Sequence, residues 1–307
     1  MKPKLLGIVI ILVSLLLSSV TGCRSQFQPG TFTDDLGREI SIEGIPQRII
    51  SLAPSNTEIL FALSLGDRVV GVTEFCNHPE AAIAKPKIGG FSTVDIESVV
   101  ALEPDLILAT SVHETKVIPR LEQLGLTVVA LAPETLDRVL ANIVLVGEVT
   151  GRSREATQLV TGLEERIKAI TDKTDSLPES QSPRVFYVLW HEPLMTVGSE
   201  ARIHELIVKA GGINIAQDLT GDYPTISLEA VILANPQVII AGSGHGTGED
   251  STFQFAKTEP ILEDIDARRH GRVYKIDADL PSRPGPRIVD ALEELARLIH
   301  PEIFGYD

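Results

Sequence analysis

Two segments of the chain repeat one pattern of hydrophobic and polar positions. Aligned without gaps, residues 95–109 and 227–241 are identical at five positions and place apolar residues against apolar residues at most of the others. Each copy starts with a helix-capping residue, continues with apolar residues at helical spacing, and meets a proline before a short apolar run. The pattern predicts, in both copies, an amphipathic helix followed by a buried parallel strand. A duplicated unit of this kind predicts two similar lobes with a cleft between them.

The segments around the two copies alternate strand and helix patterns. Short apolar runs predict strands at 48–52, 69–72, 127–131, 184–189 and 272–276. Apolar residues at helical spacing predict helices at 59–65, 115–124, 203–210 and 286–299. Ser55 and Glu58 have the spacing of a capping box and are expected to begin the first of these helices. A small hairpin with Gly37 in its turn is expected over 33–40. The fold class is therefore α/β, with parallel sheets flanked by helices.

One long helix is expected to join the two lobes. Ser153 can cap it, and four apolar residues share one of its faces up to about Lys173. The expected organisation is an N-terminal lobe, a connecting helix and a C-terminal lobe, each lobe with its own core, at 32–150, 151–175 and 183–307. A single stiff connection permits less closure of a cleft than several flexible hinge strands would.

The N-terminus has the pattern of an export signal. Lys2 and Lys4 precede an uncharged apolar run that is too short to span a membrane as a helix. Small residues then precede Cys23, which resembles a bacterial lipoprotein cleavage box. We expect a signal peptide over 1–22, lipidation of Cys23, and a tether over 23–31. The alternative is an ordinary signal peptide with an incidental cysteine. The expected location is the outer surface of the cell membrane, periplasmic or extracellular, held by the lipid anchor.

Charge and cysteine content narrow the possible partners. The chain has 42 acidic and 27 basic residues. A surface with this excess of negative charge repels nucleic acid and anionic lipid. We therefore expect no nucleic-acid partner and no membrane contact beyond the anchor. With Cys23 lipidated, only Cys76 remains, so no internal disulfide is expected.

Catalytic and cofactor-binding motifs are missing from the sequence. The His-Glu pairs at 113–114 and 204–205 lack the second histidine of a zinc helix. The glycine-rich segment 242–248 lacks the Gly-Lys-Ser/Thr ending of a phosphate-binding loop and is interpreted as a loop near the cleft. An extracellular metal-chelate reductase or hydrolase would need a nucleophile–base pair or a metal cluster, and neither is visible. We therefore expect a protein that is not an enzyme and has no resident cofactor or metal.

Bulky residues lie instead at junctions between strands and helices. Phe75, Phe91, Trp190 and Tyr223 all occupy such junctions. The carboxyl ends of parallel strands are where α/β proteins bind ligands, and aromatic faces supply large apolar contact areas. These residues could line a pocket, or they could simply cover loops.

The sequence resembles a known protein family along most of its length. It contains, in order, the sequences DDLGR, RIISLAPSNTEILFALSLGDRVVGVTEFCNHP, VDIESVVALEPDLIL, WHEPLMTVG, YPTISLEAV and RPGPRIVDALEELARLIHPE. Together with the lipoprotein signal, this series resembles the periplasmic binding proteins of ABC importers for vitamin B12, ferric siderophores and haem, with the greatest similarity to the vitamin B12-binding branch. The resemblance implies two Rossmann-like lobes joined by a backbone helix, with the ligand held between them.

The resemblance also implies a set of site residues. The positions carried over for ligand binding are Pro54, Ser55, Phe75, Phe91, Trp190, Met195, Tyr223, Asp279 and Arg283. Thr110 replaces a tryptophan of the B12-binding pocket, and Trp190 falls where the relative has glycine. These departures preserve an aromatic cleft and leave the shape of the ligand open.

Glu97 and Glu229 occupy the same position in the two repeat copies. On their own they provide favourable charge at a helix N-terminus. In the resembled family, however, the matching glutamates dock into arginine pockets of the two permease subunits, which implies an ABC permease dimer as partner. The protein itself is expected to be a monomer.

The expected transported ligand is a corrinoid similar to vitamin B12. A ferric siderophore or haem is the alternative within the family. Arg283 is the one clear basic candidate in the cleft segments, and anionic ferric complexes usually require several. Cys76, His78 or His191 could coordinate the metal of a corrinoid or haem, although a buried thiol and ordinary loop histidines explain them as well.

Overall fold

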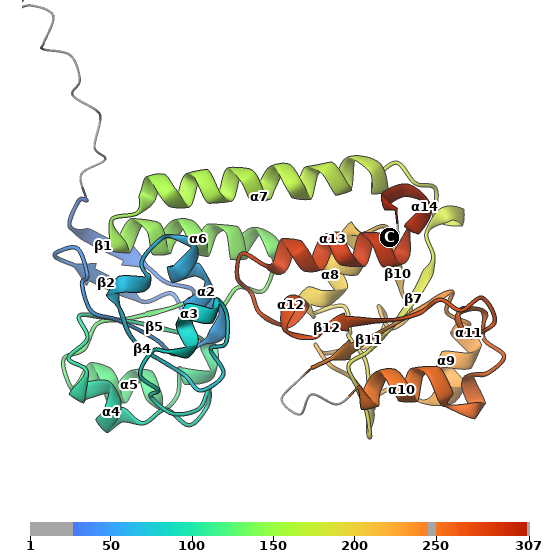
Figure 1. Ribbon diagram of the computed structural model, residues 1–307, viewed down its shortest axis with the longest axis horizontal. Coiled ribbons are helices and arrows are strands. Elements are labelled where there is room, and N and C mark those ends of the chain that lie inside the picture. The colour runs from blue at the N-terminus through green and yellow to red at the C-terminus, as the bar shows by residue number, and fades with distance from the viewer. Residues whose placement is uncertain (1–26, 245–249, 306–307) are drawn as a thin grey trace, which may run out of the picture.

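Two α/β lobes lie side by side beneath one long helix, α7 (Ser153–Thr174), which runs from one lobe to the other (Figure 1). The computed structural model describes residues 27–244 and 250–305. The expected signal peptide 1–22 and Cys23 lie outside the described residues, as does most of the segment 242–248. The prediction of two lobes with parallel sheets is confirmed.

The N-terminal lobe is built on a four-stranded parallel sheet in the order β4-β3-β5-β6. Its strands are β3 (Ile49–Ser51), β4 (Val69–Val72), β5 (Leu106–Ala109) and β6 (Val128–Ala130), preceded by the antiparallel hairpin of β1 (Gly30–Thr33) and β2 (Glu39–Ile42). Its helices are α2 (Pro54–Ala62), η1 (Gly66–Arg68), α3 (Glu80–Ile83), α4 (Ile96–Ala101), η2 (Ser111–His113), α5 (Val117–Gln123) and α6 (Leu136–Thr150).

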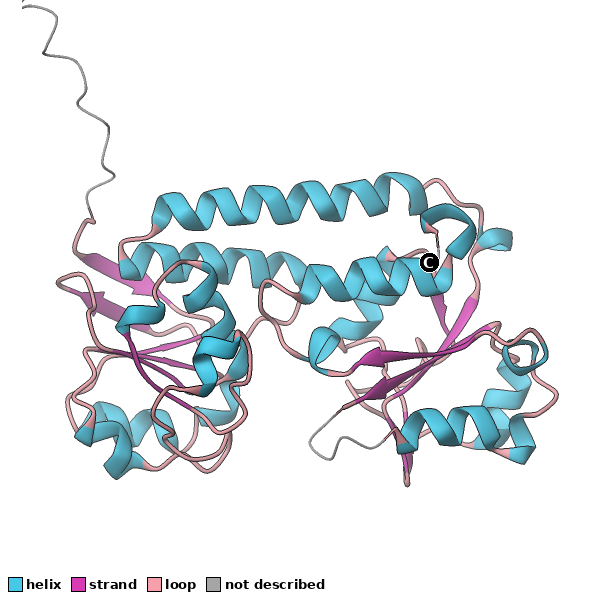
Figure 2. Cartoon of the chain, in the orientation of Figure 1, coloured by secondary structure: helices cyan, strands magenta, loops and turns pink. Residues whose placement is uncertain are grey.

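The C-terminal lobe has a second four-stranded parallel sheet in the order β10-β7-β11-β12. Its strands are β7 (Arg184–Val188), β10 (Ile213–Asn214), β11 (Val238–Ser243) and β12 (Val273–Asp277), with a small hairpin of β8 (Trp190–His191) and β9 (Leu194–Met195). Its helices are η3 (Glu179–Gln181), α8 (Arg202–Lys209), α9 (Leu228–Ala234), α10 (Ser251–Thr258), η4 (Pro260–Leu262), α11 (Asp266–Arg269), α12 (Asp279–Ser282), α13 (Ile288–Ile299) and α14 (Pro301–Phe304). Figure 2 shows that helices lie above and below the strands of each lobe.

The two repeat copies occupy equivalent places in the two sheets. β5 and β11 are both third in the spatial order of their sheets, and each pairs in parallel with the strand that comes first along the chain in its own sheet, β3 or β7. The preceding helices, α4 and α9, are capped by the side chains of Asp95 and Ser227. Arg48, just before β3, and Arg184, the first residue of β7, donate hydrogen bonds to carbonyls at the ends of these helices. The duplication therefore extends to the capping contacts.

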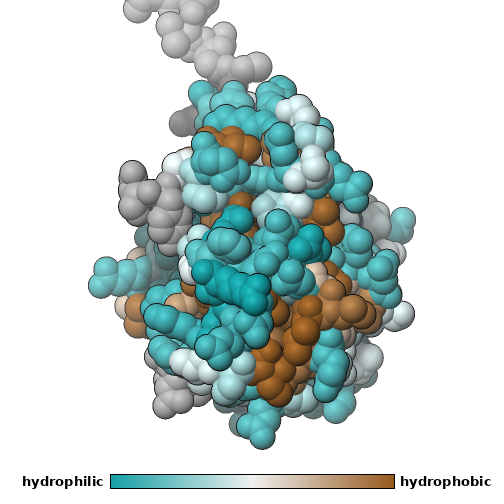
Figure 3. Space-filling view, turned by 90° about the vertical axis from the view of Figure 1, so that its right-hand side faces the viewer, coloured by the Kyte–Doolittle hydropathy of each residue, from teal (hydrophilic) through white to brown (hydrophobic). Residues whose placement is uncertain are grey.

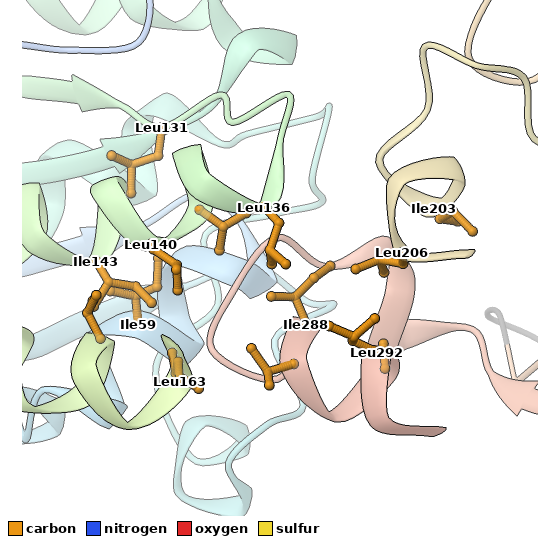
Figure 4. Packing of buried hydrophobic residues seen from close by; sticks show 14 of the residues in the cluster. Ile59, Leu131, Leu136, Leu140, Ile143, Leu163, Ile203, Leu206, Ile288 and Leu292 are labelled. Atoms are coloured by element: carbon orange, nitrogen blue, oxygen red, sulfur yellow. The ribbon is translucent and has the colours of Figure 1, made fainter. Parts of the chain in front are cut away.

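On the side of the sheets toward α7 the two lobes share one apolar cluster, while on the other side each lobe has a cluster of its own, so the expectation of separate cores holds only in part. Residues from alternating positions of the strands pack on opposite faces of each sheet, and the faces toward α7 merge into a single cluster. Figure 4 shows Leu136 of α6 and Leu206 of α8 on either side of Ile288 at the start of α13. A continuous apolar core resists relative movement of the lobes because opening it would expose apolar surface to water.

Helix α2 begins earlier than its sequence pattern predicted. Pro54 occupies its first turn and Ala53 is the N-cap residue, with no side-chain cap. Ser55 therefore lies inside the helix, and the predicted capping box with Glu58 does not form. Proline is favoured at the first helical position because its fixed φ suits a helix and its missing N–H is not needed there. Among residues 27–244 and 250–305, no helix is both long and apolar enough to cross a membrane.

Candidate functional site

A cavity of about 1480 Å³ opens between the lobes. In the described part of the chain, its lining comes largely from segments that follow the carboxyl ends of strands in both lobes: β3, β4, β5 and β6 on one side, and β7, β11 and β12 on the other. Parallel α/β sheets place their loops together at this edge. Eight of the nine residues expected to bind ligand line the cavity: Pro54, Ser55, Phe75, Phe91, Trp190, Tyr223, Asp279 and Arg283.

The four aromatic residues form walls on both sides of the cavity. Phe75 and Phe91 belong to the N-terminal lobe, and Trp190 and Tyr223 to the C-terminal lobe. All four rings are exposed, so they do not serve the core. The part of each ring that is exposed at the cavity offers flat apolar surface on which a ligand could pack.

A buried histidine holds the loop that carries Phe91. The Nδ1 atom of His113 accepts a hydrogen bond from the backbone N–H of Thr110 at 3.1 Å, and its Nε2–H donates to the carbonyl of Phe91 at 2.7 Å. The His113 ring also meets the Phe91 ring edge to face, with centroids 5.6 Å apart. Burial lowers the pKa of the imidazole below its ordinary value. The neutral tautomer therefore satisfies both nitrogens and positions one wall of the cavity.

This arrangement predicts a loss of stability in acid. Because the pKa of His113 is depressed in the folded state, the unfolded chain binds the proton first as the pH falls. The stability that the neutral His113 side chain contributes is fully present above pH 6.5, the ordinary pKa of histidine, and is lost progressively as the pH falls below it. The His113→Gln variant cannot take up this proton. We therefore expect its melting temperature to decrease less than that of the natural protein when the pH is lowered. Thermal unfolding from about pH 7.5 to about pH 5.5 measures this slope.

The exposed His270 on α11 provides a matched control. The His270→Gln variant should keep the slope of the natural protein. Equal slopes in the two variants and the natural protein would show that His113 does not carry the effect.

Arg283 joins the two lobes at one end of the cavity. Its Nη1 donates to Asn77 Oδ1 at 2.6 Å, and its Nη2 lies 2.6 Å from Asp279 Oδ2. A further, longer contact of 3.4 Å reaches the carboxylate of Glu58. The guanidinium is thus already neutralised by protein carboxylates.

Glu58 accepts a second arginine from the C-terminal lobe. Arg287 binds both of its carboxylate oxygens, at 3.0 and 2.6 Å, and this contact raises the pKa of Arg287. Only 2% of the Glu58 side chain is exposed. Between the arginines, Gly285 lies against α2, where a Cβ atom would sit 3.2 Å from the carbonyl oxygen of Ser55. The segment 283–287 is therefore docked on the N-terminal lobe by a buried ion pair. Sequence reasoning assigned Glu58 to a helix cap and missed this role.

Arg202 is a cavity residue that the sequence analysis also missed. It lies in the first turn of α8 and donates to the carbonyl of Pro133 across the lobe junction at 2.6 Å. Burial lowers the pKa of its guanidinium, although Asp222 and Tyr223 nearby oppose this shift, and arginine stays charged in proteins. Its Nε is buried without an acceptor among the described residues. Nothing in the local sequence distinguishes Arg202 from an ordinary helix residue.

Met195 is the one expected ligand-binding residue that the structure does not bring to the cavity. It lies opposite Trp190 in the hairpin of β8 and β9 and is half-buried. The resemblance gave its position in the chain, but the pairing of these short strands has no sequence signal of its own. Met195 therefore contacts the cavity only indirectly, as the strand partner of Trp190.

The three candidate metal ligands also lie outside the lining of the cavity. The thiol of Cys76 is buried within hydrogen-bonding distance of the hydroxyls of Thr57 and Thr73. The ring of His191 lies between Trp190 and the ring of a phenylalanine on α10, with centroids 5.3 and 5.8 Å away. His78 is exposed. Among the described residues there is no group of three or more His, Cys, Asp or Glu placed to hold a metal ion.

Glu97 and Glu229 are exposed in the first turns of α4 and α9. These helices belong to different lobes, and both lie on the side of the molecule away from α7 (Figure 1). Hydrogen bonds, from its own backbone and from Ser227, lower the pKa of Glu229, so it is ionised at neutral pH. The two lobes thus present equivalent carboxylates on one side of the molecule.

Comparison with known proteins gives the family. The sequence matches the periplasmic binding protein family over residues 49–280. An uncharacterized ABC transporter substrate-binding lipoprotein of Bacillus subtilis (strain 168), YvrC, is 32% identical over 92% of this chain and 88% of its own length. The vitamin B12-binding protein of Vibrio cholerae serotype O1 is 30% identical over 81% of this chain and 87% of its own length.

Solved structures agree with this assignment. The crystal structure of the periplasmic vitamin B12 binding protein BtuF of Vibrio cholerae has a TM-score of 0.69 and 29% identity, over 85% of this chain and 99% of that one. The periplasmic heme-binding protein BhuT in complex with two hemes has a TM-score of 0.74 and 25% identity, over 83% of this chain and 98% of that one. The resemblance found in the sequence is confirmed: this chain belongs to the periplasmic binding protein family, as a substrate-binding protein of ABC importers.

Proposed function

We propose that this protein captures a corrinoid in the cleft between its lobes and delivers it to an ABC permease dimer. The observation that carries the proposal is the cavity of about 1480 Å³ with aromatic walls from both lobes. A corrinoid is a broad, flat macrocycle with amide side chains, and it needs apolar faces together with a few hydrogen-bonding groups. Ser55, Asn77 and Tyr223 line the same cavity and can provide such groups.

The charged groups of the cavity favour a corrinoid over an anionic iron complex. Ferric siderophores and haem commonly carry carboxylates or other anionic groups. Only Arg202 and Arg283 are basic among the described lining residues, and Arg283 is already paired with Asp279 and Glu58. Binding an anion there would require breaking contacts that hold the lobes together, which makes a neutral, amide-rich ligand the better match.

The N-terminal pattern supports a lipid anchor. Cys23 would become the first residue of the mature chain, and acyl chains on it would hold the protein at the membrane surface. The first described element, β1, begins at Gly30, so the chain between Cys23 and the folded lobes is short. The protein would then act as an exported monomer close to its permease.

Docking onto the permease would use the side of the lobes that carries Glu97 and Glu229. Beside Glu229, three apolar side chains of α9 and η4 are exposed: Ile232, Leu233 and Ile261. The exposed fraction of Leu233 is 88%. Figure 3, which faces this end of the C-terminal lobe, shows hydrophobic residues gathered in its lower half. An apolar patch next to a carboxylate suits a protein partner with an arginine pocket.

Calorimetry of the mature protein tests the proposed ligand. Cyanocobalamin, cobinamide, haem and a ferric siderophore are titrated separately into the protein. We expect binding of the corrinoids with micromolar or lower dissociation constants and much weaker binding of the two iron complexes. Binding of haem or the siderophore alone would refute the corrinoid assignment within the family. A visible-band shift in the complex would report on coordination of the cobalt by a protein side chain.

A further inference from the structure

The described lining of the cavity contains far more acidic than basic side chains. Seven of the lining residues carry carboxylates, two are arginines, and none is lysine or histidine. Asp35 is paired with Arg138, and Asp279 with Arg283. The cavity itself, with its aromatic walls, defines the binding site, and the carboxylates determine the electrostatic field inside it.

Five of these carboxylates form no close ion pair within the described part of the chain, although Asp222 lies near enough to the Arg202 guanidinium to raise its pKa. Glu74, Glu114 and Glu134 come from the N-terminal lobe, and Glu200 and Asp222 from the C-terminal lobe. All five are exposed at the cavity, and no ion pair or side-chain hydrogen bond joins any of them to a described residue. The excess negative charge therefore faces the volume that the ligand would occupy.

A cleft lined with one sign of charge focuses that charge on its contents. The low dielectric of the two protein walls strengthens the field in the cleft, and the carboxylates of the opposed lobes repel one another across it. A bound cation reduces this repulsion, while a neutral ligand leaves it unchanged and an anion adds to it. The net charge of the ligand should therefore contribute to its affinity.

We propose that this cleft selects corrinoids that carry a net positive charge over neutral or anionic ones. This inference rests on the proposed function, because it names the form of the corrinoid that the same site prefers. The charge of a corrinoid depends on its axial ligands and on the nucleotide loop, whose phosphate is anionic. A cobinamide has no such phosphate, and with one water and one cyanide on cobalt it is a cation. Such an incomplete corrinoid would be the preferred cargo.

Two forms of cobinamide test the charge directly. Aquacyanocobinamide is a cation, and dicyanocobinamide, kept in excess cyanide, is neutral with the same ring and side chains. In calorimetry with the mature protein at low ionic strength, we expect the cation to bind roughly tenfold more tightly. Raising the salt concentration should weaken binding of the cation and leave the neutral form almost unchanged, because salt screens exposed charges. The charges concerned are those of the acidic rim, the five exposed lining carboxylates Glu74, Glu114, Glu134, Glu200 and Asp222.

Neutralising the rim should remove this preference. In the variant with Glu114→Gln, Glu134→Gln, Glu200→Gln and Asp222→Asn, the two forms should bind with nearly equal affinity, because the advantage of the cation is lost. The matched control removes four exposed carboxylates at the far side of the molecule, on and after α7: Glu164, Glu165, Asp175 and Glu179. It has the same net charge as the rim variant and should keep the preference for the cation.

Each outcome decides between the two proposals. If both forms bind the natural protein equally, or if the rim variant keeps the preference, the selection by charge is wrong while corrinoid capture stands. If neither form binds and cyanocobalamin does not bind either, corrinoid capture itself is wrong. Coordination of the cobalt by the protein could mimic a preference for the cation, but it would shift the visible spectrum and would persist in the rim variant.

Discussion

Replacing Glu97 and Glu229 together with lysine is expected to abolish uptake through the cognate importer while leaving ligand affinity unchanged. The two carboxylates occupy equivalent places on α4 and α9, one on each lobe, and neither lines the cavity. A carboxylate bound in an arginine pocket fixes the orientation of the two docked proteins. Replacing the carboxylate with lysine would place two positive charges in contact. The loss should exceed 100-fold when the contacts fail at both lobes, because each reversal costs several kcal/mol. Uptake of radiolabelled ligand into proteoliposomes that contain the permease measures it.

The control for this experiment reverses two carboxylates of α7. Glu164 and Glu165 are exposed on the opposite side of the molecule, and their replacement with lysine changes the net charge equally. That variant should transport normally. Normal transport by the Glu97 and Glu229 double reversal would refute the docking assignment, and weakened ligand binding would show that α4 and α9 serve the cleft instead.

The repeated unit was the part of the fold that the sequence predicted best. Its signals are local: a capping side chain, helical spacing, a residue before proline, and an apolar run. Asp95 and Ser227 cap their helices as expected, and Glu103 and Asn235, each just before a proline, adopt positive φ where the helices end. Local patterns of this kind need no knowledge of the rest of the chain.

The errors concern contacts between distant parts of the chain. Glu58 and Ser55 have capping-box spacing, but Glu58 binds Arg287, more than two hundred residues further on. The same spacing would suit a helix cap in another fold, because local sequence cannot show which arginine reaches a carboxylate. The shared core was missed for the same reason, since Leu136 and Ile288 meet only when both lobes are in place.

In the candidate site, too, local sequence signals were recognised and contacts between distant parts of the chain were not. Aromatic residues at strand–helix junctions were found because the carboxyl ends of parallel strands converge in space. Arg202 was missed because it reaches the cavity from the start of a helix rather than from the end of a strand. The acidic rim was also missed, since its carboxylates are far apart in sequence and become one feature only where the lobes face each other.

The lobes are held together by the connecting helix α7, by the shared apolar cluster, by single hydrogen bonds such as that of Arg202 to Pro133, and by the ion pairs of Glu58. The ion pairs of Glu58 lie directly beside the cavity, because Arg283 belongs both to these pairs and to the lining. The geometry of the ligand site then depends on a buried charge pair whose partners come from opposite lobes. Removing one partner from such a pair leaves the other charges buried without compensation.

Replacement of Glu58 with alanine should destabilise the protein strongly. Arg283 and Arg287 are 12% and 21% exposed, so two largely buried guanidinium groups would lose their shared carboxylate. We expect a loss of about 3–5 kcal/mol in the free energy of unfolding, as for other broken buried pairs. Unfolding in urea, followed by circular dichroism, measures the loss. Ligand affinity should fall as well, because Glu58 binds Arg287 and so docks the segment 283–287, which carries Arg283, on the N-terminal lobe.

Glu293 provides the matched control, since it also binds an arginine between the connecting helix and the C-terminal lobe. Its partner Arg166 is 38% exposed, and the pair lies at the surface, where water replaces a lost contact. Glu293→Ala should therefore cost at most about 1 kcal/mol. Similar small losses in both variants would show that the Glu58 pair contributes no more than an ordinary surface contact. A large loss confined to Glu58→Ala, with weaker ligand binding, would assign to this one carboxylate both the alignment of the lobes and the position of Arg283.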